Sequence, residues 1–115
     1  MRIKSHKITI IVNNEEYTTH FIFLAELGKM LKRKAVSLRK MEELGILPKS
    51  NFRMPDSKLA NGKTRKGYRI YSLLLANELV KIFDGIKQGI KINNDQRTLL
   101  IKAFNTEISM IKNSK

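Results

Sequence analysis

The predicted fold rests on residues 24–48, which read LAELGKMLKRKAVSLRKMEELGILP. Apolar residues recur at helical spacing over residues 24–31 and again over residues 35–44, with a few basic residues between the two segments. Gly45 supplies a backbone conformation that ends helices, and Pro48 cannot continue one. The stretch therefore predicts two short helices joined by a tight turn, which is the arrangement of a helix-turn-helix.

Segments with strand character flank this helix pair. Residues 7–23 are rich in Ile, Val, Thr and aromatic residues and are broken once by a pair of asparagines, which predicts a β-hairpin. Residues 49–67 are polar and basic and predict a loop or a long hairpin tip. Residues 68–71, Tyr-Arg-Ile-Tyr, regain strand character, with Tyr68 and Ile70 expected on one face. A β-ribbon beside a helix pair predicts a wing.

Two further helices are predicted after the wing. Ser72 can cap the first, and Asn93 or Asn94 can cap the second. The predicted fold class is therefore mainly α with a small β part: a winged helix-turn-helix with an N-terminal β-hairpin and C-terminal helices. A single domain is expected over residues 1–115, with the hairpin at 7–23, the helix-turn-helix and wing at 23–71, and the C-terminal helices at 72–112.

The charge of the chain is strongly positive and unevenly distributed. Its net charge is +13, from 23 basic and 10 acidic residues. Residues 29–69 hold 13 of the basic residues and three of the acidic ones, so this stretch carries +10 of the total. Such a concentration of cations is typical of proteins that bind nucleic acid.

Other classes of protein receive little support. The chain has no cysteine, which leaves no disulfide or thiolate metal site, and His6 and His20 lack the close spacing of metal ligands. No nucleophile with a partner base and no phosphate-binding glycine loop is seen, so an enzyme or a cofactor is not expected. The apolar runs are far shorter than the ~20 residues of a membrane-spanning helix, and no signal peptide is recognised. A cytoplasmic protein without a membrane partner is expected.

The second predicted helix carries the first group of candidate DNA contacts. A DNA reader needs a rigid element that fits the major groove, side chains that reach base edges, and cations for the phosphates. With Leu38 and Met41 packed inward, the basic side of this helix is expected to face outward. The candidates are Lys34, Ser37 and Lys40 for base edges, and Arg33 and Arg39 for phosphates.

The wing carries the second group. A solvated basic face with no partner is the alternative for the second helix taken alone, but the second cationic cluster in the adjacent wing favours DNA. One of the two wing tyrosines is expected to pack within a strand, and the other to offer its hydroxyl to a phosphate. The candidates are Lys63, Arg65, Lys66, Tyr68, Arg69 and Tyr71.

Three motifs in this region point to one family. They are Ser37-Leu38-Arg39, the run from Glu43 to Pro48, and the run from Gly67 to Ser72. Together they resemble, in order, the DNA-binding half of the MerR family and extend over roughly half of the chain. The resemblance implies a winged helix whose second helix enters the major groove and whose wing grips the flanking backbone. It also implies phosphate contacts by Arg39 and Arg69, with Tyr68 or Tyr71 supporting the wing.

The sequence departs from that family at several points. Lys32, Arg33 and Lys34 replace the usual small and hydroxyl residues of the turn, and a basic segment over residues 51–66 lengthens the wing. A hairpin precedes the motif, and the C-terminal part is too short for a long dimerising coiled coil with an effector domain. Cysteines for metal sensing are absent. Metal sensing is therefore not expected.

The leading prediction is a sequence-specific double-stranded DNA-binding protein that regulates transcription. An architectural DNA-binding factor, such as an excisionase-like or packaging accessory protein, is an alternative that the sequence does not separate from it. A basic module that binds an acidic protein is another, and the few aromatic residues of the basic region argue against single-stranded RNA. Double-stranded DNA is the expected partner. A homodimer through the C-terminal helices and a contact with the transcription machinery stay open.

Overall fold

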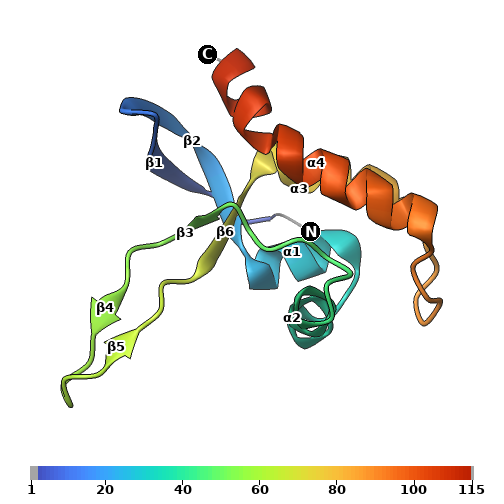
Figure 1. Cartoon of the computed structure of the whole chain (residues 1–115), viewed down its shortest axis with the longest axis horizontal. Coiled ribbons are helices and arrows are strands. Elements are labelled where there is room, and N and C mark those ends of the chain that lie inside the picture. Colours follow the sequence, from blue (N-terminus) through green and yellow to red (C-terminus); the bar gives the residue numbers. More distant parts are fainter. Residues whose placement is uncertain (1–2, 115) are drawn as a thin grey trace.

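A computed structural model describes residues 3–114 of the chain (Figure 1), so the predicted domain over 1–115 includes three residues outside it. The elements are β1 (His6–Val12), β2 (Glu15–Phe23), α1 (Leu24–Leu31), α2 (Ala35–Glu43), β3 (Phe52–Arg53), β4 (Ser57–Lys58), β5 (Thr64–Arg65), β6 (Arg69–Ser72), α3 (Leu73–Asp84) and α4 (Asn94–Asn113).

Four strands form one antiparallel sheet in the order β1-β2-β6-β3. β1 and β2 make the predicted hairpin, in which Asn13 and Asn14 adopt positive φ angles of 51° and 66°. Two such residues in succession are typical of the type I′ turn, whose twist matches that of the strands it joins. β6 pairs with β2, where Ile22 lies opposite Tyr71, and with β3 on its other side. β6 is therefore an inner strand of the sheet.

Each face of the sheet has its own apolar core. Neighbouring residues of a strand point to opposite faces, so Ile22 of β2 and Phe21 beside it enter different clusters. The larger cluster contains Ile22, Tyr71 and buried residues of all four helices. The smaller one contains Phe21, Ile70 and, from the far end of α4, Ile111. The inner part of β6 is thus buried on both faces.

The predicted fold class is wrong. The described residues are 44% helix and 23% strand, and the four strands form a curled antiparallel sheet that resembles half of a barrel, not the small wing of a mainly α winged helix-turn-helix. The N-terminal hairpin is not an appendage, because β2 pairs directly with the strand that was expected to belong only to the wing. Local strand patterns do not reveal such long-range pairing, because the partners of a strand can lie far away in the sequence.

The turn between α1 and α2 is tightly fixed. Lys32 adopts the left-handed conformation with a φ of 55°, and the Arg33 amide donates to the Gly28 carbonyl oxygen at 2.9 Å. The Arg33 guanidinium donates to the carbonyl oxygens of Leu31, at 3.0 Å, and Ile86, at 2.7 Å, and lies 5.4 Å from the Phe83 ring centroid. These contacts join the helix pair to the end of α3.

α3 and α4 run side by side and pack on the sheet through the larger core cluster (Figure 1). Both helices begin at the predicted caps: the Ser72 hydroxyl accepts from the Leu75 amide at 3.1 Å, and the Asn93 side chain accepts from the Gln96 amide at 2.8 Å. Within residues 3–114, no helix combines the length and the apolar character that crossing a membrane requires.

A buried carboxylate connects α4 to the sheet. Glu107 is fully buried, and its side chain accepts from the Ser72 amide and from the Asn51 side-chain amide, both at 2.9 Å. Asn51 also donates to the Phe104 carbonyl oxygen at 2.7 Å. Desolvation raises the pKa of Glu107, although the hydrogen bonds from Ser72 and Asn51 act in the opposite direction. The network fixes α4 against the start of the segment that leads into β3.

The raised pKa of Glu107 predicts a pH-dependent stability. A carboxyl group whose pKa is higher in the folded state stabilises the fold most below its unfolded pKa, and that contribution is lost as the pH rises through the folded pKa. The Glu107→Gln side chain carries no charge to desolvate. As the pH rises from acid to neutral, the melting temperature of this variant is therefore expected to increase relative to that of the wild type. Thermal unfolding of both proteins across this range measures the difference. A difference that does not change with pH would contradict the prediction.

Candidate nucleic-acid interface

The outward face of α2 differs from the predicted one. Its exposed residues are Val36, Arg39, Lys40 and Glu43, and Val36 keeps 62% of its surface accessible. Ser37, expected on this face, is half-buried because residues four apart lie on the same side of a helix, and it therefore shares the side of Met41. Val36 was missed, although its position three and four residues before Arg39 and Lys40 could have identified it.

A second set of predicted residues surrounds the N-terminal end of α2. Lys34 and Ser37 line a groove of about 790 Å³ together with Lys29 and Lys32. Lys34 is exposed and precedes the first residue of the helix. Arg33 also lines this groove, but its guanidinium donates to backbone carbonyls and is half-buried, so its role is structural and the predicted phosphate contact is not supported.

The segment from residue 52 to residue 69, named here the basic ribbon, extends away from the body of the protein (Figure 1). Lys63, Arg65 and Lys66 are all exposed along it. β4 and β5 pair near its far end, where the Leu59 amide donates to the Lys63 carbonyl oxygen at 2.8 Å. The ribbon therefore presents its cations on a hydrogen-bonded frame.

The base of the ribbon closes around Gly67. Its amide donates to Asp56 Oδ1 and its carbonyl oxygen accepts from Arg53 Nη1, both at 2.9 Å. A Cβ atom at this position would lie 1.7 Å from the Met54 carbonyl oxygen. Only glycine therefore allows the two sides of the ribbon to approach this closely. The Met54 amide donates to the Tyr68 carbonyl oxygen at 2.9 Å beside it.

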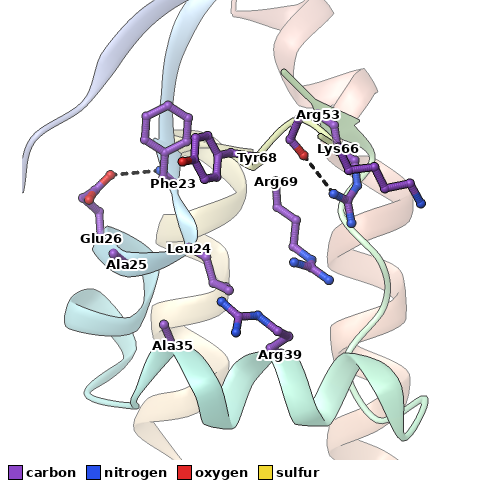
Figure 2. A pocket seen from close by; sticks show the side chains of 11 residues that line it. Phe23, Leu24, Ala25, Glu26, Ala35, Arg39, Arg53, Lys66, Tyr68 and Arg69 are labelled. Atoms are coloured by element: carbon purple, nitrogen blue, oxygen red, sulfur yellow. Dashed lines mark hydrogen bonds between the residues drawn. The ribbon is translucent and has the colours of Figure 1, made fainter. Parts of the chain in front are cut away.

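A groove of about 740 Å³, named here the central groove, lies between the helix pair and the ribbon. Figure 2 shows Arg39 of α2 and Arg69 of β6 reaching toward one another across it, while Lys66 points away from its centre. Four cations line it, Arg39, Arg53, Lys66 and Arg69, and Glu26 is the one acid among the described residues of its wall. Glu26 accepts from the Phe23 amide at 3.0 Å. An excess of positive charge thus faces the groove.

One of these cations already has a protein partner. Arg69 Nε and Nη2 each donate to a carboxylate oxygen of Glu42 at 2.9 Å, in a pair that is largely removed from solvent. The hydrogen bonds from Arg69 to Glu42 raise the pKa of the guanidinium further above its usual range. Arg69 therefore connects β6 to α2. The family resemblance implies a phosphate contact by Arg69, but the charge of its guanidinium is already neutralised by Glu42, so this contact is not supported.

Arg53 is a groove cation that the sequence did not single out. It lies directly opposite Arg69 in the pairing of β3 with β6. Like charges at paired positions repel, and Glu42 offsets this repulsion by neutralising Arg69. Only the strand register places Arg53 at the groove, so no pattern in the sequence could have distinguished it from the other basic residues of the segment.

The two wing tyrosines have different roles. Tyr71 is fully buried in the larger core, burial raises the pKa of its hydroxyl, and that hydroxyl has no hydrogen-bond partner among residues 3–114. The prediction that Tyr71 contacts DNA is therefore wrong. Tyr68 is 57% exposed, lines the central groove, and its hydroxyl accepts a hydrogen bond from Arg65 Nη2. One tyrosine packs and the other is accessible, as the sequence suggested without saying which.

The chain was compared with family models, with curated proteins and with solved structures, and none of them matches. The resemblance to the MerR family therefore stays a prediction from three motifs. Among the predicted contacts, the structure brings Arg39, Lys66, Tyr68 and Arg69 to one groove. Lys40 is exposed on α2, and Lys63 and Arg65 are exposed on the basic ribbon.

Proposed function

We propose that the protein binds double-stranded DNA and regulates transcription. The observation that carries the proposal is the central groove, where cations from α2 and from the basic ribbon face each other across a space of about 740 Å³. Phosphate contacts supply most of the affinity of proteins for DNA, and arginine and lysine are the side chains that make them. Arg39 and Arg53 provide such contacts within the groove, and Lys66 provides one at its rim.

α2 is the element proposed to enter the major groove. An α-helix fits that groove, and the outward face of α2 combines a long cation with an apolar side chain, Lys40 and Val36. Lysine can donate to guanine acceptors and an apolar side chain can contact the thymine methyl group. The basic ribbon, which forms the opposite wall of the central groove, would then follow the phosphate backbone.

Removal of a groove cation tests the proposal. Arg39→Ala and Lys66→Ala are each expected to weaken duplex binding for all sequences and to lower the slope of log affinity against log salt by about 1. Lys112→Ala is the matched control, because this exposed lysine lies near the end of α4, far from α2 in Figure 1. Fluorescence anisotropy of a labelled duplex over a range of salt concentrations measures these changes. Equal losses for all three variants would contradict the assignment of the groove.

Selection from a library of random duplexes tests whether α2 reads sequence. A defined motif is expected for the wild type, and Val36→Ser or Lys40→Ala is expected to alter the preferred bases while retaining much of the affinity. Weak binding that is uniform over sequences and vanishes with salt would leave only a non-specific DNA-binding protein.

A further inference from the structure

The sheet brings together aromatic side chains that are distant in the sequence. The His6 and Phe23 rings lie 4.8 Å apart between centroids, and the Phe23 and Tyr68 rings lie 5.8 Å apart in an edge-on arrangement. The Arg65 guanidinium lies 5.1 Å from the centroid of Tyr68 and completes the row. An aromatic surface of this kind was not expected from the composition of the basic region, because its members come from β1, β2 and the ribbon.

Tyr68 is the accessible member of this row. It is 57% exposed, and Arg65 holds it twice, over its ring and through a hydrogen bond to its hydroxyl. A ring held in this way loses little conformational freedom when a ligand stacks on it. Figure 2 shows Tyr68 beside Phe23 at one end of the central groove.

The cations of the groove lie next to this ring. Arg39 reaches into the groove from α2, and Arg53 is held in its wall by the Gly67 carbonyl oxygen. A nucleobase stacks on aromatic rings, and the phosphate attached to it pairs with arginine, so the two halves of the groove match the two halves of one nucleotide. The volume of about 740 Å³ falls within the range of roughly 300–1,000 Å³ that small-ligand sites occupy.

A base within an intact duplex cannot reach Tyr68 in this way, because both of its faces are covered by neighbouring bases. We propose that the central groove takes one unpaired nucleotide that adjoins a duplex, with the base on Tyr68 and its phosphate on Arg39 and Arg53. This inference rests on the proposed function and defines its substrate as DNA with an unpaired base beside paired ones.

Two duplexes that differ only by one unpaired adenine in one strand test the proposal. The wild type is expected to bind the bulged duplex about tenfold more tightly than the paired one, since stacking on an aromatic side chain contributes that much per base. Tyr68→Leu is expected to abolish this preference, so that it binds the bulged and the paired duplex with equal affinity. Tyr68→Phe keeps the ring and is expected to keep most of the preference. A fluorescent adenine analogue at the bulge should be quenched by the wild type and by Tyr68→Phe only.

The outcomes separate the two proposals. Equal affinity of the wild type for both duplexes, or a preference that survives in Tyr68→Leu, overturns the nucleotide site and leaves duplex binding intact. Absence of binding to either duplex overturns the proposed function and the nucleotide site together. Circular dichroism of Tyr68→Leu should match that of the wild type, because the side chain is mostly exposed and outside both core clusters.

Discussion

Gly67→Ala is expected to destabilise the protein by about 3 kcal/mol or more, or to open the basic ribbon at its base. The added methyl group would lie 1.7 Å from the Met54 carbonyl oxygen and 2.9 Å from that of Pro55, and both are backbone atoms that no rotamer change can move. The two sides of the ribbon must separate, which breaks the hydrogen bonds of Gly67 with Asp56 and Arg53. On the proposed function, DNA affinity falls by about tenfold or more because the ribbon cations lose their fixed positions.

Gly62→Ala is the matched control within the same ribbon. No atom lies within 4 Å of a Cβ atom at Gly62, but its φ of 82° makes any side chain strained. That strain costs about 1–2 kcal/mol and leaves the base of the ribbon closed. Chemical denaturation and hydrogen exchange at Met54 and Gly67 distinguish the variants. Equal and small losses of stability in the two variants would show that the close approach at Gly67 does not constrain the fold.

Gly28→Ala is expected to destabilise the fold by about 2–3 kcal/mol. Helix propensity alone predicts the opposite sign, because alanine in the middle of a helix is better than glycine by about 1 kcal/mol. The structure determines which effect is larger: a Cβ atom on Gly28 would lie 2.6 Å from the Arg33 carbonyl oxygen, in the turn that positions α2. Relief requires the turn to move away from α1.

Gly85→Ala tests the same exchange without a clash. Gly85 follows α3 with a φ of −86°, which alanine adopts readily, and its Cβ atom would meet only the Ile82 carbonyl oxygen at 3.7 Å. The variant is expected to gain about 0.4–1 kcal/mol because alanine restricts the unfolded chain. Urea denaturation of both variants measures the change in the free energy of unfolding, which is expected to be a decrease for Gly28→Ala and an increase for Gly85→Ala. A stabilised Gly28→Ala protein would show that the Arg33 carbonyl oxygen does not limit the space at Gly28.

Local signals in the sequence were sufficient for most of the elements. The asparagine pair between two strand-forming runs predicted the β1–β2 hairpin, and Ser72 predicted the start of α3. Both helices of the pair were also predicted, and Asn93 was one of the two residues predicted to cap α4, because turn residues, caps and helical periodicity act over a few residues. The fold class was wrong because it depends on which strands pair, and the partners of β6 lie far away in the chain.

The candidate site was predicted less well than the elements. Charge identified the region that contains the central groove, but it did not distinguish Arg39, which faces the groove, from Arg33, which binds backbone carbonyls. Tyr71 looked equivalent to Tyr68 until the sheet showed one buried and one exposed. The role of a cation or a tyrosine depends on the backbone that surrounds it, and that backbone is assembled from separate segments.

The pairing of β2 with β6 also bears on the order of folding. It pairs Phe23 with Ile70, so the helix pair and the ribbon together form one long connection between two neighbouring strands. Closing a loop of about fifty residues is entropically costly and slows folding, whereas the β1–β2 hairpin and the α3–α4 pair involve short connections. The central groove exists only after this closure. On the proposed function, the appearance of DNA binding during refolding is expected to follow this slow closure, later than the recovery of helix.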